Sequence, residues 1–180
     1  MSTASRFVPN YTVDDYRHWD GDWQLIEGVP VAMSPSPFAV HERIATEFVK
    51  SFGSQIDQQG CDCRVYAGLD WIVSDNTVVR PDVMVVCGPQ PERHLERPPV
   101  VAVEILSPSP RELDLVVKRR IYQQNGVAFY VIADPETKQV EIARTGTPPG
   151  ESETIDEEQT AELQVSEDCQ ITVNARQAFR

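Results

Sequence analysis

The chain has 180 residues, 41% of them hydrophobic and 24% charged, and carries a formal net charge of −12 at pH 7. These values are typical of one soluble globular domain, and no apolar run approaches the roughly 20 residues that a membrane-spanning helix needs. The start of the chain lacks the apolar core of a signal peptide, so we expect a cytoplasmic protein with no membrane partner.

The negative charge argues against a broad electrostatic contact with nucleic acid, which is itself polyanionic. The charge is unevenly distributed, because residues 151–168 contain eight acidic residues and no basic ones. The rest of the chain carries 20 acidic against 16 basic residues. Beyond roughly 8 Å the field of the acidic segment is largely screened at physiological salt. The composition therefore disfavours tight DNA binding without excluding it.

The first part of the chain predicts a short helix, a hairpin and a long helix. Thr12 and Asp15 form a capping-box pattern at the start of a helix over residues 12–19. Residues 23–26 and 29–33 predict two strands that meet at the Glu27-Gly28 turn. Ser36-Pro37 then supplies an N-cap and a first helical position. The helix that follows has an apolar residue at every fourth position: Val40, Ile44, Phe48, Phe52 and Ile56.

Four strand-like runs come next, at residues 62–67, 69–73, 78–86 and 100–106. Gly68 and Asp75-Asn76 separate the first three runs, which we expect to form a meander. Ser109 and Glu112 form a second capping box with Pro110 at the first helical position, which predicts a helix ending near Asn125.

Gly126 is the expected C-terminal cap of that helix. Residues 127–133 and 140–144 predict two antiparallel strands around a turn at residues 134–138. We expect residues 145–160 to form a mobile acidic loop and residues 169–173 to add an edge strand. This order predicts a single α/β or α+β domain over residues 1–180, a mixed β-sheet core flanked by helices.

The four cysteines are Cys61, Cys63, Cys87 and Cys169. They lack the regular spacing of a disulfide framework, so we expect them to be reduced. Cys61 and Cys63 supply only half of a zinc site. We therefore interpret the cysteines as small, mostly buried apolar residues.

Two of the strand-like runs each carry one acidic residue, and this pair is the strongest indication of function. Asp82 follows Arg80-Pro81 within the run at 78–86, and Glu104 lies within the run at 100–106. An ionised carboxylate is costly to bury unless a cation or hydrogen bonds compensate. If the two runs pair, both carboxylates point to one face, where they could bind Mg²⁺ together with the Ile105 carbonyl and waters. The alternative is that each acid ends its strand at the solvent edge.

Lys118 is the candidate cation beside this pair. It follows Asp114 by four residues on one helix face, and it could orient water or stabilise charge on a phosphate. The alternative is a solvated surface salt bridge worth only a few tenths of a kcal/mol. His41 could also support the site, although a lone histidine there is more often a packed or surface residue. Tyr122 and Tyr130 are expected to be core or rim aromatics.

Motifs over nearly the whole chain resemble the Uma2 (DUF820) family, a branch of the PD-(D/E)XK nuclease superfamily. They comprise residues 23–28, residues 33–37 with His41, Arg80-Pro81-Asp82, residues 103–109, Asp114, Lys118, Tyr122, residues 125–130 and residues 133–135. The resemblance implies a restriction-endonuclease-like core in which Asp82 is the metal-binding aspartate and Glu104 its partner acid. It also implies a Mg²⁺- or Mn²⁺-dependent endonuclease that hydrolyses DNA.

Two departures from the family pattern bear on this function. The superfamily lysine would fall at Leu106, so the cation must come from elsewhere, and Lys118 fits the family's displaced version. Gln24 stands where Uma2 sequences often have Glu, and a neutral amide would weaken a metal site. Glu27 could replace it, but its side chain points to the opposite face of a regular strand. The rival hypothesis is a nuclease-like fold used as a binding or regulatory module without turnover.

Aromatic residues gather near the start of the chain: Tyr11, Tyr16, Trp19 and Trp23. Exposed aromatic patches tend to mark interfaces, and a two-fold dimer is the commonest soluble oligomer, so one interpretation is a homodimer. The other interpretation is that these rings close one end of the monomer's own core.

Overall fold

The centre of the protein is a six-stranded mixed sheet, seen in a computed structural model that describes residues 9–33, 38–107, 111, 113–146 and 151–180. From one edge to the other its strands are β10 (Glu153–Ile155), β9 (Gln139–Arg144), β8 (Phe129–Asp134), β7 (Val101–Ile105), β6 (Val83–Cys87) and β3 (Cys63–Ala67). Strands β7 and β8 run parallel, whereas the other neighbouring pairs are antiparallel. The predicted mixed sheet flanked by helices is confirmed.

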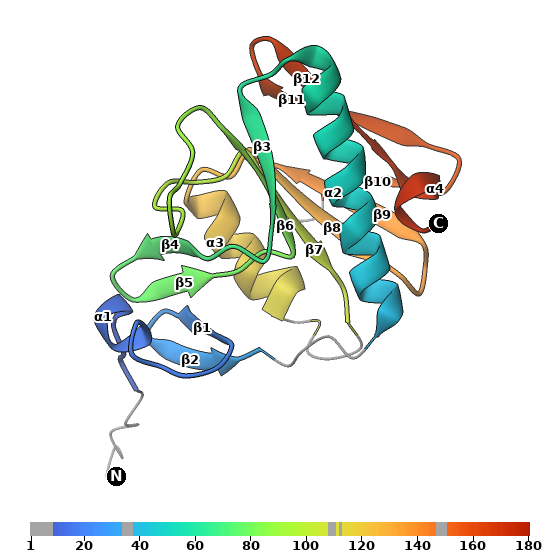
Figure 1. Ribbon diagram of the computed structural model, residues 1–180. Helices are drawn as coiled ribbons and strands as arrows, with labels where there is room; N and C mark the ends of the chain where they lie inside the picture. The colour runs from blue at the N-terminus through green and yellow to red at the C-terminus, as the bar shows by residue number, and fades with distance from the viewer. Residues whose placement is uncertain (1–8, 34–37, 108–110, 112, 147–150) are drawn as a thin grey trace.

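One face of this sheet is covered by the long helix α2 (Ala39–Gln59), which Figure 1 shows lying across the sheet. The predicted apolar stripe is confirmed for Ile44, Phe48, Phe52 and Ile56, which are buried against the strands. It is wrong for Val40, which is exposed in the first turn. The expected Ser36-Pro37 cap lies outside the described residues. Across the described ranges, no helix is both long enough and apolar enough to cross a membrane.

The C-terminal part of the chain covers the same face. It consists of β11 (Thr160–Ser166), β12 (Cys169–Asn174) and α4 (Ala175–Ala178). Strands β11 and β12 form a hairpin of their own, and their buried residues join the core beneath α2. The segment 145–160, predicted as a loop, instead contains β10 and the first residue of β11.

The opposite face is covered by a π-helix, η1 (Leu113–Lys118), which continues into α3 (Arg119–Gln124). This segment connects the parallel strands β7 and β8, which a tight turn could not join. Ile121 and Tyr122 of α3 pack into a second core on this side of the sheet. The second predicted capping box, Ser109 with Glu112 and Pro110, lies outside the described residues.

A smaller sheet lies beyond α3 and is joined by the short helix α1 (Val13–Tyr16) (Figure 1). Its strand order is β2 (Val29–Ala32), β1 (Trp23–Ile26), β5 (Thr77–Val79) and β4 (Trp71–Ser74), and β1 and β2 form the predicted hairpin. The capping box at α1 is confirmed, since the Thr12 backbone N–H donates to Asp15 Oδ2 at 2.8 Å and the Asp15 N–H donates to Thr12 Oγ1 at 3.3 Å.

Residues 78–86 do not form one strand, so that prediction is wrong. Strand β5 ends at Val79 in the small sheet, and β6 begins at Val83 in the large one. The chain changes sheets at Arg80-Pro81-Asp82, because Pro81 has no N–H to donate to a ladder. The predicted meander is also wrong, because its first two strands lie in different sheets. Strand β3 pairs with β6 in the large sheet, whereas β4 pairs with β5 in the small one.

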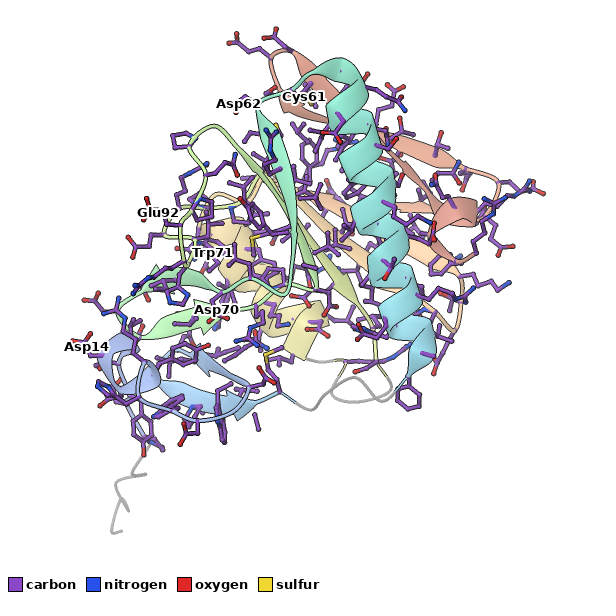
Figure 2. The ribbon with its side chains drawn as sticks, in the orientation of Figure 1. Asp14, Cys61, Asp62, Asp70, Trp71 and Glu92 are labelled. Carbon is purple, nitrogen blue, oxygen red and sulfur yellow. A yellow bond between two sulfur atoms is a disulfide. The ribbon has the colours of Figure 1, made fainter. Side chains whose placement is uncertain are left out.

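The cysteines are not reduced, contrary to the prediction. Cys61 is bonded to Cys169 and Cys63 to Cys87, across sequence separations of 108 and 24 residues. Cys61 follows α2 and lies beside the β11–β12 hairpin (Figure 2), and its disulfide joins the hairpin to the rest of the core. The pairing removes the cysteine-based argument for a reducing compartment.

The aromatic residues near the start of the chain pack against one another. The Trp19 ring makes edge contacts with Tyr11, Tyr16 and Trp23, at centroid distances of 5.3, 5.5 and 5.9 Å. Tyr16 and Trp19 also pack against the small core that contains Leu25. This arrangement agrees with the interpretation that the rings close one end of the monomer's core.

Candidate active site

Asp82 occupies the junction between the two sheets, immediately before β6. Strand β6 pairs with β7 in the register Val83 opposite Val103, so one step further places Asp82 opposite Glu104. The Ile105 backbone N–H donates to Asp82 Oδ2 at 2.7 Å, which ties this carboxylate to β7. Glu104 faces α3, where Lys118 and Tyr122 contact it, whereas the Asp82 carboxylate contacts the Ile105 N–H and His41 of α2. The register thus brings the backbones of the two acids opposite one another, and a shared metal site stays a prediction.

Glu104 is buried, and two donors compensate its charge. Lys118 Nζ lies 3.0 Å from Glu104 Oε1, and the Tyr122 hydroxyl donates to the same oxygen at 2.6 Å. Burial raises the pKa of Glu104 to about 8; the Lys118 charge opposes this shift, and the Asp82 and Asp114 charges add to it. Burial thus disfavours the ionised form of Glu104 unless a neighbouring positive charge compensates it.

Lys118 lies at the end of the π-helix and does not form the solvated surface salt bridge of the alternative hypothesis. Its side chain is 5% exposed, and its Nζ contacts Asp114 Oδ1 at 3.0 Å as well as Glu104. Burial alone would lower the pKa of Lys118, but the Glu104 and Asp114 carboxylates outweigh it and raise the pKa. Lys118 is therefore a charged lysine held between Glu104 and Asp114.

His41 reaches Asp82 from the first turn of α2. Its Nε2 lies 3.2 Å from Asp82 Oδ2, and its Nδ1 lies 3.5 Å from Glu42 Oε1. Burial alone would lower the pKa of His41, but the Asp82 hydrogen bond and charge, aided by Glu42, raise it. The structure thus makes His41 a direct neighbour of the predicted metal aspartate.

The two other predicted support residues have structural contacts. Gln24 is buried on β1, and its Oε1 accepts a hydrogen bond from the Arg80 backbone N–H at 3.1 Å. It therefore anchors the junction that precedes Asp82. Glu27 lies in the β1–β2 turn with a positive φ of 50°, and its carboxylate pairs with Arg120 at 2.8 Å. Among the described residues, its recorded partners do not include Asp82 or Glu104.

Tyr122 is a site residue that sequence reasoning placed only in the core. It is fully buried, and its hydroxyl contacts Glu104, while its ring packs edge-on against Tyr130 at a centroid distance of 4.9 Å. Its spacing of four residues from Lys118 was the available signal, because such residues share a helix face. A tyrosine hydroxyl on that face needs a polar partner when it is buried.

The side chains present fit a hard divalent cation, provided that waters and backbone complete its shell. No cluster of three or more His, Cys, Asp and Glu side chains suited to a metal occurs in the described part of the chain. Mg²⁺ characteristically uses one or two carboxylates and keeps several waters, so two carboxylates suffice. The contacts described above use one oxygen of each acid, Oδ2 of Asp82 and Oε1 of Glu104.

The mixed sheet between helices defines an α+β protein, with the buried Lys118 paired to Glu104 on one face of the sheet. A family model described as "Uma2: Putative restriction endonuclease" matches residues 13–175, and the chain belongs to this family. A solved structure titled "a putative nuclease belonging to DUF820 from Anabaena variabilis ATCC 29413" has the same fold, with a TM-score of 0.79 and 20% sequence identity. The similarity covers 94% of this chain and 97% of that one. No curated protein matches the chain.

Proposed function

We propose that the protein is a divalent-metal-dependent endonuclease that hydrolyses phosphodiester bonds in DNA. The observation that supports this proposal is the position of Asp82, immediately before β6 and opposite Glu104 in the β6–β7 register, with Lys118 bonded to Glu104. Membership of a family described as a restriction endonuclease supports the same activity. A purely structural ion pair would not need the second acid on the neighbouring strand.

The acid pair would hold Mg²⁺ or Mn²⁺ through Asp82, Glu104 and the backbone carbonyl of Ile105. Such an ion lowers the pKa of a bound water and neutralises charge on a phosphate. The protein residues keep the two acids in position: the Ile105 N–H and His41 hold Asp82, whereas Tyr122 and Lys118 hold Glu104.

We propose that Lys118 contacts the attacking water or the phosphate. An ammonium group has three N–H donors, and the contacts to Glu104 and Asp114 account for two of them. We assign the third to a water or a phosphate oxygen, where a fixed positive charge stabilises the charge that develops during hydrolysis. Since Asp114 and Glu104 hold the ammonium from two sides, it needs little reorganisation during the reaction.

A plasmid-nicking assay with purified protein and Mn²⁺ tests the proposal. Wild-type protein should convert supercoiled plasmid to the nicked form, and Asp82→Ala and Glu104→Ala should not. Asp14→Ala is a matched control, because Asp14 is an exposed acid that pairs only with Arg17 among the described residues. Equal activity in the Asp82→Ala and Glu104→Ala variants would contradict the proposal. A folded wild type that nicks nothing in Mg²⁺ or Mn²⁺ would favour the binding or regulatory module.

The homodimer stays a separate proposal. A dimer would present two sites to duplex DNA, which a one-site monomer cannot cut on both strands in one encounter. Light scattering measures the molar mass in solution. A mass near 20.2 kDa would exclude the homodimer, and a mass near twice that value would support it.

A further inference from the structure

An apolar pocket reaches the proposed site through His41, and its other lining residues have no role in the proposed hydrolysis. Its volume is about 240 Å³, and its walls include Phe38, Val40, Leu106 and Pro135, with His41 on the side toward Asp82. Small-molecule sites usually span about 300–1,000 Å³, so this pocket fits a group of one or two rings rather than a whole ligand.

Two of the pocket residues are exposed apolar side chains that local structure does not explain. Phe38 is the N-cap residue of α2, a position that favours Ser, Thr, Asp or Asn, and it makes no side-chain capping bond. It is 49% exposed, and Val40 in the first turn of α2 is 43% exposed. Single exposed apolar residues are ordinary, but two that line one pocket at a reaction site favour a ligand.

The pocket is continuous with the proposed reaction site. His41 lines the pocket and also contacts Asp82 through Nε2 at 3.2 Å. Leu106 follows Glu104 by two residues, just past the end of β7, and packs in the core on the α3 side of the sheet. A group bound in the pocket would therefore be a near neighbour of the phosphodiester attacked at the acid pair.

The charges at the rim exclude a phosphate as the occupant. Arg111 and His41 are the basic residues of the described lining. Arg111 is already paired with Asp134 at 2.9 Å and Glu136 at 3.1 Å, and His41 contacts Asp82 and Glu42. Two carboxylates against one guanidinium leave no net positive charge for an anion. An uncharged flat ring suits these walls, since Phe38 offers a stacking face and the Arg111–Glu136 pair offers donors and acceptors to a ring edge.

The net charge of the chain also favours contact with bases over contact with phosphates. A chain with a net charge of −12 has little electrostatic attraction to a polyanion, so its affinity must come from contacts that do not depend on charge. Stacking of a base on an aromatic side chain is such a contact and tolerates any sequence. In a duplex both faces of each base are already stacked, so only an unpaired base can enter a pocket.

We propose that the pocket formed by Phe38, Val40, His41 and Leu106 binds an unpaired nucleobase next to the scissile phosphate. The preferred substrate is then single-stranded or locally unpaired DNA rather than regular duplex. This inference rests on the proposed function, because it places the pocket relative to the phosphodiester that the acid pair attacks.

Binding measured in EDTA tests the pocket without cleavage. The probe is a single-stranded DNA oligonucleotide that carries 2-aminopurine, compared with the same strand in a duplex. Wild-type protein should bind the single strand more tightly and quench the 2-aminopurine fluorescence through stacking. Phe38→Ala should weaken binding about 5- to 100-fold, as expected for the loss of one base–aromatic stack. Phe38→Leu should weaken it too, whereas Phe38→Tyr should keep it.

Tyr11→Ala is the matched control, since Tyr11 is an aromatic residue with similar exposure outside this pocket. It should bind the oligonucleotide as wild type does, and circular dichroism should show all variants folded. Binding unaffected by Phe38→Ala, weakened equally by Tyr11→Ala, or as tight for duplex as for single strand would overturn the inference. The nicking assay reports on the acid pair and the binding assay on the pocket, so each can fail without the other.

Discussion

The Lys118 ammonium nitrogen lies 3.0 Å from Glu104 Oε1, although the two residues belong to different layers of the fold. Glu104 comes from β7, and Lys118 comes from the π-helix η1 that crosses the sheet. Their side chains are only 3% and 5% exposed. Such an ion pair persists because each charge compensates the other, and the loss of one partner leaves a buried charge unpaired.

Lys118→Met should lower the free energy of unfolding by about 3–5 kcal/mol, because it leaves the Glu104 and Asp114 carboxylates without their cation. Adding Glu104→Gln to this variant should restore part of the loss, since it removes one of the unpaired charges. Urea unfolding of the wild type, the two single variants and the double variant gives the coupling energy. A cost below about 1 kcal/mol for Lys118→Met would mean that the pair behaves as a solvated one.

Tyr122→Phe should reduce plasmid nicking about 10- to 100-fold, the usual effect of removing a partner that orients a metal ligand. The ring and its packing stay, so the lost group is the hydroxyl that donates to Glu104 Oε1 at 2.6 Å. Tyr130→Phe is the matched control, because its hydroxyl donates to the Asp114 backbone carbonyl at 2.9 Å. The control should cost about 0.5–1.5 kcal/mol of stability and leave the nicking rate nearly unchanged. Equal rate losses in both variants would argue against a specific role for Tyr122.

The two disulfides should contribute unequally to stability. The Cys61–Cys169 bond closes a loop of 108 residues and the Cys63–Cys87 bond one of 24. In the chain-entropy treatment, the longer loop gives on the order of 1 kcal/mol more stabilisation. Urea unfolding of Cys61→Ala/Cys169→Ala and Cys63→Ala/Cys87→Ala should show the larger loss for the first pair. Four titratable thiols in the unfolded, non-reduced wild type would contradict the disulfides themselves.

The acid pair could be predicted from the sequence because its signal is local. Each acid belongs to a run of apolar β-branched residues, and the period of two along a strand makes a shared face for Asp82 and Glu104 a direct expectation. The break between β5 and β6 at Arg80-Pro81-Asp82 was not predicted, because apolar residues continue on both sides of it. Pro81 was the one residue that indicated a break. The continuous pattern from Val78 to Val86 is compatible with one strand or two, and only the pairing of the two sheets decides between them.

Contacts between distant segments could not be predicted in this way. The Asp114–Lys118 spacing indicates a shared helix face but not that the face is buried against β7. The cysteine partners are distant in sequence, and pairing depends on where α2 ends relative to the C-terminal hairpin. The contact between His41 and Asp82 likewise depends on how the first turn of α2 lies against the end of the sheet.

The central claim is that Asp82 and Glu104 together hold a divalent cation, and a Mn²⁺ titration followed by electron paramagnetic resonance tests it most directly. The resonance of free Mn²⁺ should be lost on adding wild-type protein, with one ion bound per chain. Asp82→Ala and Glu104→Gln should each leave the ion free, and Asp14→Ala should bind as wild type does. No binding by folded wild type, or undiminished binding by Asp82→Ala, would contradict the account.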